Sequence, residues 1–365
     1  MLITGERHEA LREQIARWNR SHPVGTPVHC QIYPERTYRT RTPAMLLFNR
    51  KAVIHLEGFS GYFDLNEVYP VTEPIPIPER RVAVLFPGQG AQSKGMGREL
   101  FAAFPEQTFL ASQVLGYSIE RLCLEDPDNL LDQTRYTQVA IYVVNALSYK
   151  HHLQRHAICD PAFLMGHSIG EYNALLAANV FDFETGLRLV MKRGNLMGMI
   201  EGGAMAAVLG ISPERIREIL SSRGLNDIDL ANYNTPAQTV ISGLAPAIER
   251  AISTLATQDI RAVRLRVSGA FHSRYMHDAQ QAFAEYAKGF TFAAPKIPVI
   301  ANATGRPYES GSIIETLSAQ IVSPVRWMNS IQYVLNQGEI EFVEIGSTFL
   351  RSMVREISAH TSAAG

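Results

Sequence analysis

A serine between two glycines is the strongest candidate for chemistry in this chain. The segment Gly166-His167-Ser168-Ile169-Gly170 follows a short apolar run and opens a helical pattern. Glycines on both sides leave room for the sharp turn that exposes a nucleophilic serine at the end of a strand. Amides of the following helix would favour negative charge beside the hydroxyl. The pattern predicts a nucleophile elbow at Ser168, and an ordinary strand-to-helix turn with a surface serine is the alternative.

A serine nucleophile needs a base, and His272 is the histidine best placed to supply it. It lies in Gly269-Ala270-Phe271-His272-Ser273, where a predicted strand returns the chain toward the elbow. No aspartate stands at an obvious third position. The imidazole would therefore be oriented by a backbone carbonyl or by an amide such as that of Gln320. We predict a dyad of Ser168 and His272.

Two backbone amides are candidates for an oxyanion hole, since acyl transfer needs fixed donors for the charge that forms on the carbonyl oxygen. Ile169 follows the nucleophile, and Gln89 lies in Pro87-Gly88-Gln89-Gly90 after another predicted strand. This loop matches no nucleotide-phosphate motif. A tight turn and an oxyanion hole remain the two interpretations of it.

Arg193 is a charged residue on the apolar face of a predicted helix. Its neighbours one turn away are all apolar, namely Leu189, Val190, Leu196 and Met197. A buried guanidinium without a partner is costly, so it must meet a carboxylate. That carboxylate belongs either to the protein, in a structural ion pair, or to a dicarboxylic acyl ligand held by the guanidinium fork.

The elements that must position these residues form an α/β pattern. Val82 to Phe86 is a continuous apolar run of the kind found in buried parallel strands. Further segments of the same pattern are helices at about 95–123, 136–155 and 182–199 and strands at 161–165, 297–301 and 342–345. Alternation of strands and helices predicts a hydrolase-like α/β core with a parallel sheet.

A second lobe and an N-terminal domain complete the predicted organisation. Residues 203–267 follow the βαββαβ order of a ferredoxin-like subdomain. The large α/β subdomain would then cover 81–202 and 268–356, with a tail at 357–365. Residues 1–72 combine one helix, at 7–18, with short β-type runs that resemble small SH3-like barrels, and a proline-rich linker follows at 73–80.

Composition narrows the class of protein. The 365 residues include 34 Lys and Arg and 35 Asp and Glu, a formal net charge of -1, which gives no support for nucleic acid or a membrane surface as partner. Cys30, Cys123 and Cys159 are too few and too scattered for a disulfide framework or a zinc site, and they predict buried thiols in a reducing compartment. Without a membrane-spanning run or secretion signal, we expect a soluble cytoplasmic enzyme with no metal.

Several segments together resemble one family, the malonyl-CoA:acyl carrier protein transacylases. The resemblance covers residues 81–356 and rests on Phe86-Pro87-Gly88-Gln89-Gly90-Ala91-Gln92, Tyr136-Thr137-Gln138, Gly166-His167-Ser168-Ile169-Gly170-Glu171-Tyr172, Lys192-Arg193-Gly194, Asn232-Tyr233-Asn234-Thr235-Pro236, Gly269-Ala270-Phe271-His272-Ser273 and Ser323-Pro324-Val325-Arg326-Trp327. The residues around Glu171 and Arg274 look most like those of the free-standing acyltransferases that serve polyketide synthases without a transferase domain of their own.

This resemblance implies a two-step reaction without a bound cofactor. Ser168, activated by His272, would take a malonyl group from coenzyme A and pass it to the phosphopantetheine thiol of an acyl carrier protein. The resemblance also assigns the remaining site residues: Arg193 to the malonyl carboxylate, Gln89 and Ile169 to the oxyanion hole, Gln138 to the pocket wall, Asn234 to the acyl or pantetheine path, Gln320 to the orientation of His272 and Phe271 to exclusion of an α-methyl branch.

Three alternatives remain open from the sequence. Ile169 stands where the family usually has leucine, which leaves room for another dicarboxylic extender unit. An acyl-thioester hydrolase could use the same Ser168 and His272, although editing relatives tend to lose the arginine found here at 193. A non-enzymatic docking subunit with a vestigial transferase fold is the third, and the intact set of Ser168, His272 and Arg193 speaks against it.

Overall fold

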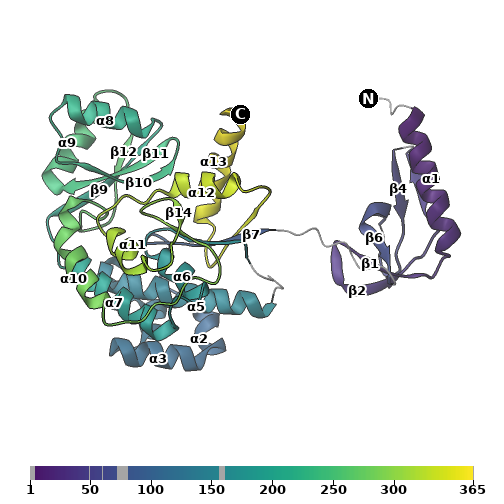
Figure 1. The fold of residues 1–365 in the computed structure, drawn as a ribbon, viewed down its shortest axis with the longest axis horizontal. Coiled ribbons are helices and arrows are strands. Elements are labelled where there is room, and N and C mark those ends of the chain that lie inside the picture. The colour runs from purple at the N-terminus through teal and green to yellow at the C-terminus, as the bar shows by residue number, and fades with distance from the viewer. Residues whose placement is uncertain (1–4, 49, 60, 72–80, 156–160, 365) are drawn as a thin grey trace. The chain divides into compact units, whose positions relative to one another are not determined.

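The computed structural model describes residues 5–48, 50–59, 61–71, 81–155 and 161–364. The chain divides into two compact units, Met1–Arg80 and Arg81–Gly365, which Figure 1 colours purple and blue to yellow respectively. The predicted linker at 73–80 and Cys159 lie outside the described residues. Cys30 and Cys123 are both buried.

The first unit packs one helix against six short strands. Helix α1 (Gly5–Ser21) lies beside two antiparallel three-stranded sheets, in the orders β2-β1-β6 and β3-β4-β5. The strands are β1 (Pro27–Cys30), β2 (Tyr33–Arg39), β3 (Met45–Leu47), β4 (Lys51–Ile54), β5 (Phe63–Asp64) and β6 (Val68–Pro70), with a 3-10 turn η1 (Leu65–Glu67) before the last. Leu11, Ile15 and Trp18 of α1 cover a core that includes Val28 and Ile54. The sequence of β2 is largely polar and lacks the alternation of a half-buried strand, so it carries little signal for a strand.

The second unit is built on a five-stranded sheet in the order β14-β13-β8-β7-β15. Its strands are β7 (Val82–Phe86), β8 (Phe163–Gly166), β13 (Val299–Ala301), β14 (Arg306–Pro307) and β15 (Glu341–Glu344). All neighbouring pairs are parallel except β13 with β14, which is antiparallel. The predicted parallel sheet is therefore corrected to a mixed one. The two-residue edge strand β14 is too short to produce a sequence pattern.

Helices cover both faces of this sheet, as Figure 1 shows around β7. Side chains alternate along each strand, so Val84 and Phe86 pack toward α5 (Thr134–Arg155), α6 (Gly170–Ala177) and α7 (Phe183–Gly198), while Ala83 and Leu85 pack toward α12 (Trp327–Leu335) and α13 (Phe349–Ala364). The remaining helical segments are α2 (Arg98–Ala103), α3 (Pro105–Leu115), α4 (Ile119–Glu125), η2 (Pro127–Asp132), η3 (Arg274–Met276), α10 (His277–Ala287) and α11 (Ile313–Ala319).

Two helix predictions need correction. The pattern at 95–123 is three helices, because Pro105 starts α3 directly after α2 and Gly116 ends α3 in the left-handed conformation, at φ 77°. The predicted tail at 357–365 is helical as far as Ala364. Ile357 is fully buried against the sheet, and this contact holds the last turns of α13 in place.

The inserted subdomain contains β9 (Gly203–Leu209), α8 (Pro213–Ser222), β10 (Asp229–Thr235), β11 (Gln238–Leu244), α9 (Ala245–Ala256) and β12 (Ala262–Arg264). Its antiparallel sheet has the order β10-β11-β9-β12, which is that of a ferredoxin-like fold. Ala204 and Ala206 face α8 and α9. Met205, on the opposite face of β9, belongs to the core of the large subdomain, so this face turns toward the large sheet.

Candidate active site

The turn after β8 has the geometry of a nucleophile elbow. Ser168 has a φ of 50°, in the left-handed region that non-glycine residues rarely adopt. A Cβ atom on Gly166 would lie 2.0 Å from the carbonyl carbon of Gly170, and one on Gly170 would lie 2.2 Å from the Phe86 oxygen. Only glycine fits at either position. The two glycines allow α6 to begin directly against the ends of β7 and β8.

Ser168 and His272 meet at hydrogen-bond distance. The Ser168 Oγ atom lies 2.8 Å from His272 Nε2, and His272 Nδ1 lies 2.8 Å from the backbone oxygen of Gln320. Because a carbonyl can only accept, Nδ1 carries the proton and Nε2 is free to accept from the serine. Burial, and secondarily the charge of Arg193, lowers the pKa of His272 to about 3. The imidazole is therefore neutral at physiological pH, as a general base must be.

The carbonyl of Gln320, rather than its amide, orients the imidazole. The side chain of Gln320 has other partners. Its Nε2 atom donates to the backbone oxygen of Ser168 at 2.8 Å and to Glu171 Oε2 at 3.0 Å, and its Oε1 atom accepts from Arg193. Of the two ways of orienting the base that the sequence left open, the structure shows the first. Gln320 nevertheless joins the nucleophile, the base and the arginine.

Arg193 is fully buried beside the nucleophile. Its Nη2 atom donates to Gln320 Oε1 at 3.0 Å and to Ser168 Oγ at 3.3 Å, and the guanidinium lies over the Tyr172 ring at 5.7 Å. Nε and Nη1 make no hydrogen bond, and no carboxylate of the described residues forms an ion pair with Arg193. Burial lowers the pKa of the guanidinium, although the buried Tyr172 hydroxyl is close enough to raise it. Two buried donor nitrogens of a cation therefore point to a missing anion.

Two polar residues to which the sequence assigns no role lie beside the elbow, and one of them, Asn302, holds its backbone in place. Asn302 accepts from the Ser168 amide through Oδ1 and donates to the Gly166 oxygen through Nδ2, both at 2.7 Å. Glu171 is fully buried and accepts from the Asn302 amide at 2.9 Å, from Gln320 and from the hydroxyl of Tyr308. The available signal was a polar residue shortly after each of two buried strands: Asn302 directly follows β13, and Glu171 lies in the first turn of α6, after β8 and the elbow. A known sheet order would have made this signal informative.

The loop after β7 packs against the elbow. The His167 amide donates to the Phe86 oxygen at 3.0 Å, and a Cβ atom on Gly88 would lie 2.3 Å from the His167 oxygen. Asn145 of α5 donates to the Pro87 oxygen at 3.0 Å and thereby fixes the base of the loop. Gln89 lines the same cavity as Ser168. The two predicted oxyanion donors, the amides of Gln89 and Ile169, thus belong to adjoining turns.

A cavity of about 360 Å³ opens onto Ser168 and His272. Asn234 and Phe271 line it, as do Met205 and Leu265 of the ferredoxin-like subdomain and Phe349 at the start of α13. Asn234 Oδ1 lies 3.0 Å from His167 Nε2. Neither Gln138 nor Arg193 is among the lining residues. Gln138 is buried on α5 with its Nε2 atom 3.8 Å from Met197 Sδ, and its place in the pocket wall stays a prediction.

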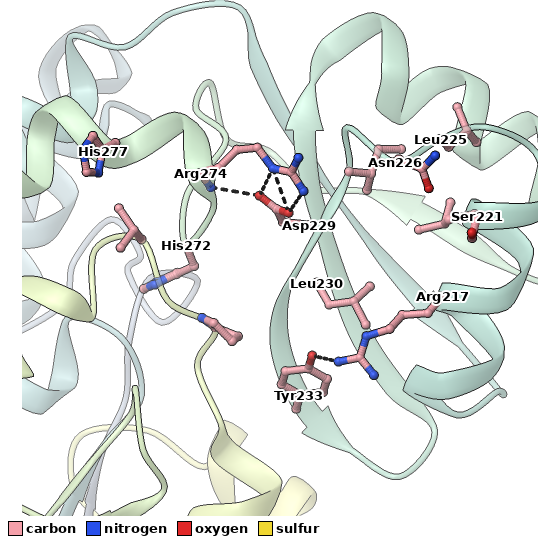
Figure 2. Close-up of a pocket in the computed structure, with 14 residues that line it drawn as sticks. Arg217, Ser221, Leu225, Asn226, Asp229, Leu230, Tyr233, His272, Arg274 and His277 are labelled. Atoms are coloured by element: carbon pink, nitrogen blue, oxygen red, sulfur yellow. Dashed lines mark hydrogen bonds and ion pairs between the residues drawn. The ribbon is translucent and has the colours of Figure 1, made fainter.

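A second, larger cavity of about 910 Å³ reaches the His272 segment from another side. Figure 2 shows it between α8 with the following loop and the segment that carries His272 and Arg274. Arg274 Nε lies 3.0 and 3.1 Å from the carboxylate oxygens of Asp229, and Arg217 donates to the Tyr233 hydroxyl. His272 is its one lining residue in common with the cavity at Ser168. The Arg274–Asp229 pair joins the two subdomains across it.

Glu171 should make stability depend on pH. Burial raises the pKa of its carboxyl from near 4.5 to about 7, against the effect of its hydrogen bonds and of Arg193. The folded protein then keeps a proton that the unfolded chain releases, so the free energy of unfolding falls as pH rises from about 4.5 to 7. Relative to Glu171→Gln, the wild type should lose roughly 1 kcal/mol per pH unit across this window. Calorimetric melting of both proteins measures it, and a difference that does not vary with pH would contradict the raised pKa.

Comparison with known proteins identifies the family. Residues 84–358 match the family described as the acyl transferase domain. The chain belongs to this family. This acyl transferase is 49% identical to the polyketide biosynthesis malonyl CoA-acyl carrier protein transacylase PksC of Bacillus subtilis over 267 residues, which are 73% of this chain and 92% of PksC. It is 48% identical to BaeC of Bacillus velezensis, which carries the same description, over 77% of this chain and 98% of BaeC.

Other relatives are much longer. The acyl transferase is 52% identical to the polyketide biosynthesis protein ThaF of Burkholderia thailandensis and 50% identical to PksE of Bacillus subtilis, over 75% and 76% of this chain, yet the matches span only 24% and 36% of those proteins. Among solved structures, the malonyl CoA-acyl carrier protein transacylase of Burkholderia pseudomallei matches with a TM-score of 0.75 and 49% identity, covering 77% of this chain and 98% of that one. The family recognised from the sequence is confirmed.

The described side chains of this chain include no group of three or more His, Cys, Asp or Glu placed to hold a metal ion. None of the described helices combines the length and apolar character needed to cross a bilayer.

Proposed function

We propose that this chain is a malonyl-CoA:acyl carrier protein S-malonyltransferase that serves a polyketide synthase. The observation that carries the proposal is Arg193, a fully buried cation with two unpartnered nitrogens whose Nη2 lies 3.3 Å from the Ser168 hydroxyl. An acyl group attached to Ser168 and ending in a carboxylate would supply the missing anion. The transacylase names of PksC and BaeC support the same reaction.

In the first step Ser168 is acylated. His272 Nε2 takes the hydroxyl proton while Oγ attacks the thioester carbonyl of malonyl-CoA, and the amides of Ile169 and Gln89 receive the oxyanion. The C–S bond then breaks, and the coenzyme A sulfur leaves with the proton held by His272. The product is a malonyl ester on Ser168. The carbonyl of Gln320 keeps the imidazole in the tautomer that both proton transfers need.

The second step reverses the first with another thiol. The phosphopantetheine thiol of the carrier protein gives its proton to His272 Nε2 and attacks the ester carbonyl, and the same two amides stabilise the oxyanion. The C–O bond breaks, and Ser168 Oγ recovers the proton from His272. Malonyl is thus moved between two thiols, and the protein itself needs no further cofactor.

Selectivity would be set by Arg193 at the carboxylate end of the acyl group and by Phe271 beside its α-carbon. Phe271 lines the cavity and its ring occupies the space beside Gly269, where a Cβ atom would lie 2.3 Å away. The ring has little room to retreat, so it would crowd an α-methyl branch. Malonyl rather than a branched extender unit is the proposed substrate, with Asn234 on the pantetheine path.

The partner is proposed to be a carrier protein domain of the synthase. A complex described as a type II polyketide synthase acyl-carrier protein with its malonyl-transacylase matches this chain at 33% identity and a TM-score of 0.71. The N-terminal unit lies outside the family match. Its two small sheets, linked by the Thr40–Leu56 bridge, fit an SH3-like barrel that would contact the synthase in the cytoplasm.

Intact mass spectrometry tests the proposal directly. The protein is incubated separately with malonyl-, methylmalonyl- and acetyl-CoA, and a holo carrier protein is then added. We expect a malonyl adduct that maps to the Ser168 peptide and moves to the carrier protein. Absence of a malonyl adduct would refute the assignment, and release of free malonate instead of transfer would identify a hydrolase.

A further inference from the structure

A row of buried polar groups runs from Tyr308 to Arg193 behind the nucleophile. The Tyr308 hydroxyl donates to Glu171 Oε1, Glu171 Oε2 accepts from Gln320 Nε2 at 3.0 Å, and Gln320 Oε1 accepts from Arg193 Nη2 at 3.0 Å. Glu171, Arg193 and Gln320 are all fully buried. Water does not compete for these contacts, so each group depends on the next for its partner.

The row fixes which way the Gln320 amide points. Its Nε2 group faces two acceptors, Glu171 Oε2 and the backbone oxygen of Ser168 at 2.8 Å. Its Oε1 atom faces a guanidinium, which can only donate. A flipped amide would place an oxygen against two acceptors and an NH₂ group against a cation. Glu171, the Ser168 backbone oxygen and Arg193 therefore together exclude the flipped amide, and Glu171 is the one of the three that lies outside the reacting groups.

Above its pKa of about 7 Glu171 is ionised, and the amide then separates two opposite charges. Glu171 is the buried carboxylate nearest in this row to Arg193, yet Gln320 stands between them and no ion pair forms. A carboxylate in direct contact would occupy the guanidinium and compete with the carboxylate of an acyl group. Because the Gln320 side chain lies between them, Glu171 offsets the buried positive charge of Arg193 without bonding to its Nε and Nη1 atoms.

We propose that Glu171 is a positioning residue for acyl-group selection, which acts through the Gln320 amide to hold Arg193 ready for a carboxylate. The inference rests on the proposed function, since it assigns the arginine to the acyl carboxylate. It predicts that Glu171 affects the choice between carboxylated and uncharged acyl groups. The chemistry of Ser168 and His272 should not depend on it, because His272 is held by the Gln320 backbone oxygen.

The test compares Glu171→Gln with the wild type. Glutamine keeps the shape of the side chain but offers an NH₂ group that can face either end of the Gln320 amide, so one of the three contacts that oppose the flipped amide is lost. We expect kcat/KM for malonyl-CoA loading to fall by about tenfold or more, with acetyl-CoA loading changed by less than about threefold. Labelling of Ser168 by a fluorophosphonate should keep its wild-type rate, since it needs only the nucleophile and the base.

Two further variants make the result decisive. Tyr308→Phe removes one donor to Glu171 but leaves both acceptors that face Gln320. Against the larger effect of burial, the Tyr308 hydrogen bond lowers the pKa of Glu171, so its loss raises that pKa above about 7, and the variant should keep the wild-type preference for malonyl at a pH well above the raised value. Gln320→Met removes the acceptor for Arg193 while retaining the backbone oxygen that holds His272. It should reproduce the loss seen in Glu171→Gln, and it serves as the test if that variant does not fold.

Three outcomes would overturn the inference: an unchanged malonyl preference in both Glu171→Gln and Gln320→Met, equal losses of malonyl and acetyl loading, or loss of fluorophosphonate labelling in folded variants. The last two would show that Glu171 supports the site as a whole. These results are distinct from failure of the proposed function, which would appear as a wild-type protein that takes no malonyl group.

Discussion

Replacement of Ser168 by alanine is expected to abolish the malonyl adduct while leaving the protein folded. The backbone of the elbow is held by Asn302 and by the two glycines, not by the serine hydroxyl. Among the described residues, the hydroxyl forms hydrogen bonds with His272 and Arg193 only. Its loss removes the atom that must form the ester and little that supports the fold.

His272→Ala should retain the nucleophile but lose the base, so loading should slow by roughly 10²- to 10⁴-fold. His277→Ala is the matched control, because that histidine lies on the exposed start of α10 and hydrogen-bonds to Gln281. Rates come from intact mass measured against time, and melting temperatures establish folding. A malonyl adduct of wild-type size on folded Ser168→Ala would place the nucleophile elsewhere.

Arg193→Ala should reverse the preference of the enzyme among acyl groups. Each hydrogen bond to a charged group contributes about 1.5–3 kcal/mol, so loss of the two hydrogen bonds of the guanidinium fork should lower malonyl loading by about 10²- to 10⁴-fold. Acetyl-CoA gains, because an uncharged acyl group no longer has to cover a buried cation. Loading of both thioesters in competition, read by intact mass, measures the ratio. Arg188→Ala, which breaks an exposed pair with Glu184 on the same helix, is the control.

The same variant should change the pH dependence of the nucleophile. The charge of Arg193 helps to lower the pKa of His272, so its removal raises that pKa and the imidazole becomes protonated at a higher pH. As the pH is lowered, fluorophosphonate labelling of Ser168 should therefore be lost at a higher pH in Arg193→Ala than in the wild type. An unchanged malonyl preference together with an unchanged pH profile would mean that Arg193 is a structural residue.

The sequence predicted those parts of the site that are encoded locally. The elbow needs glycines at 166 and 170 because of contacts within one turn and with the adjacent strand, so its signature is continuous along the chain. Arg193 was recognised because a cation among apolar residues on one helix face conflicts with the pattern around it. The βαββαβ order of 203–267 was readable for the same reason, since each of its elements carries its own periodicity.

The parts that could not be predicted depend on which strands lie side by side. Asn302 reaches the elbow because β13 pairs with β8, and no pattern in either strand states that pairing. Glu171 and Gln320 are 149 residues apart in sequence. Gln320 was proposed as a partner of His272, but whether its carbonyl or its amide would serve depended on the conformation of the turn after α11. The pairing of β14 with β13 rests on two residues and has no periodicity to detect.

Ser168 and His272 share an unusual backbone, since their φ angles of 50° and 55° both lie in the left-handed region. A residue with a side chain is disfavoured there by about 1–2 kcal/mol, and glycine largely escapes this cost. Yet glycine at either position would remove the nucleophile or the base. Heat resistance and turnover are therefore opposed at these two positions. A laboratory selection for thermal stability alone would tend to enrich inactive proteins, so such a selection on this scaffold needs an activity screen at every round.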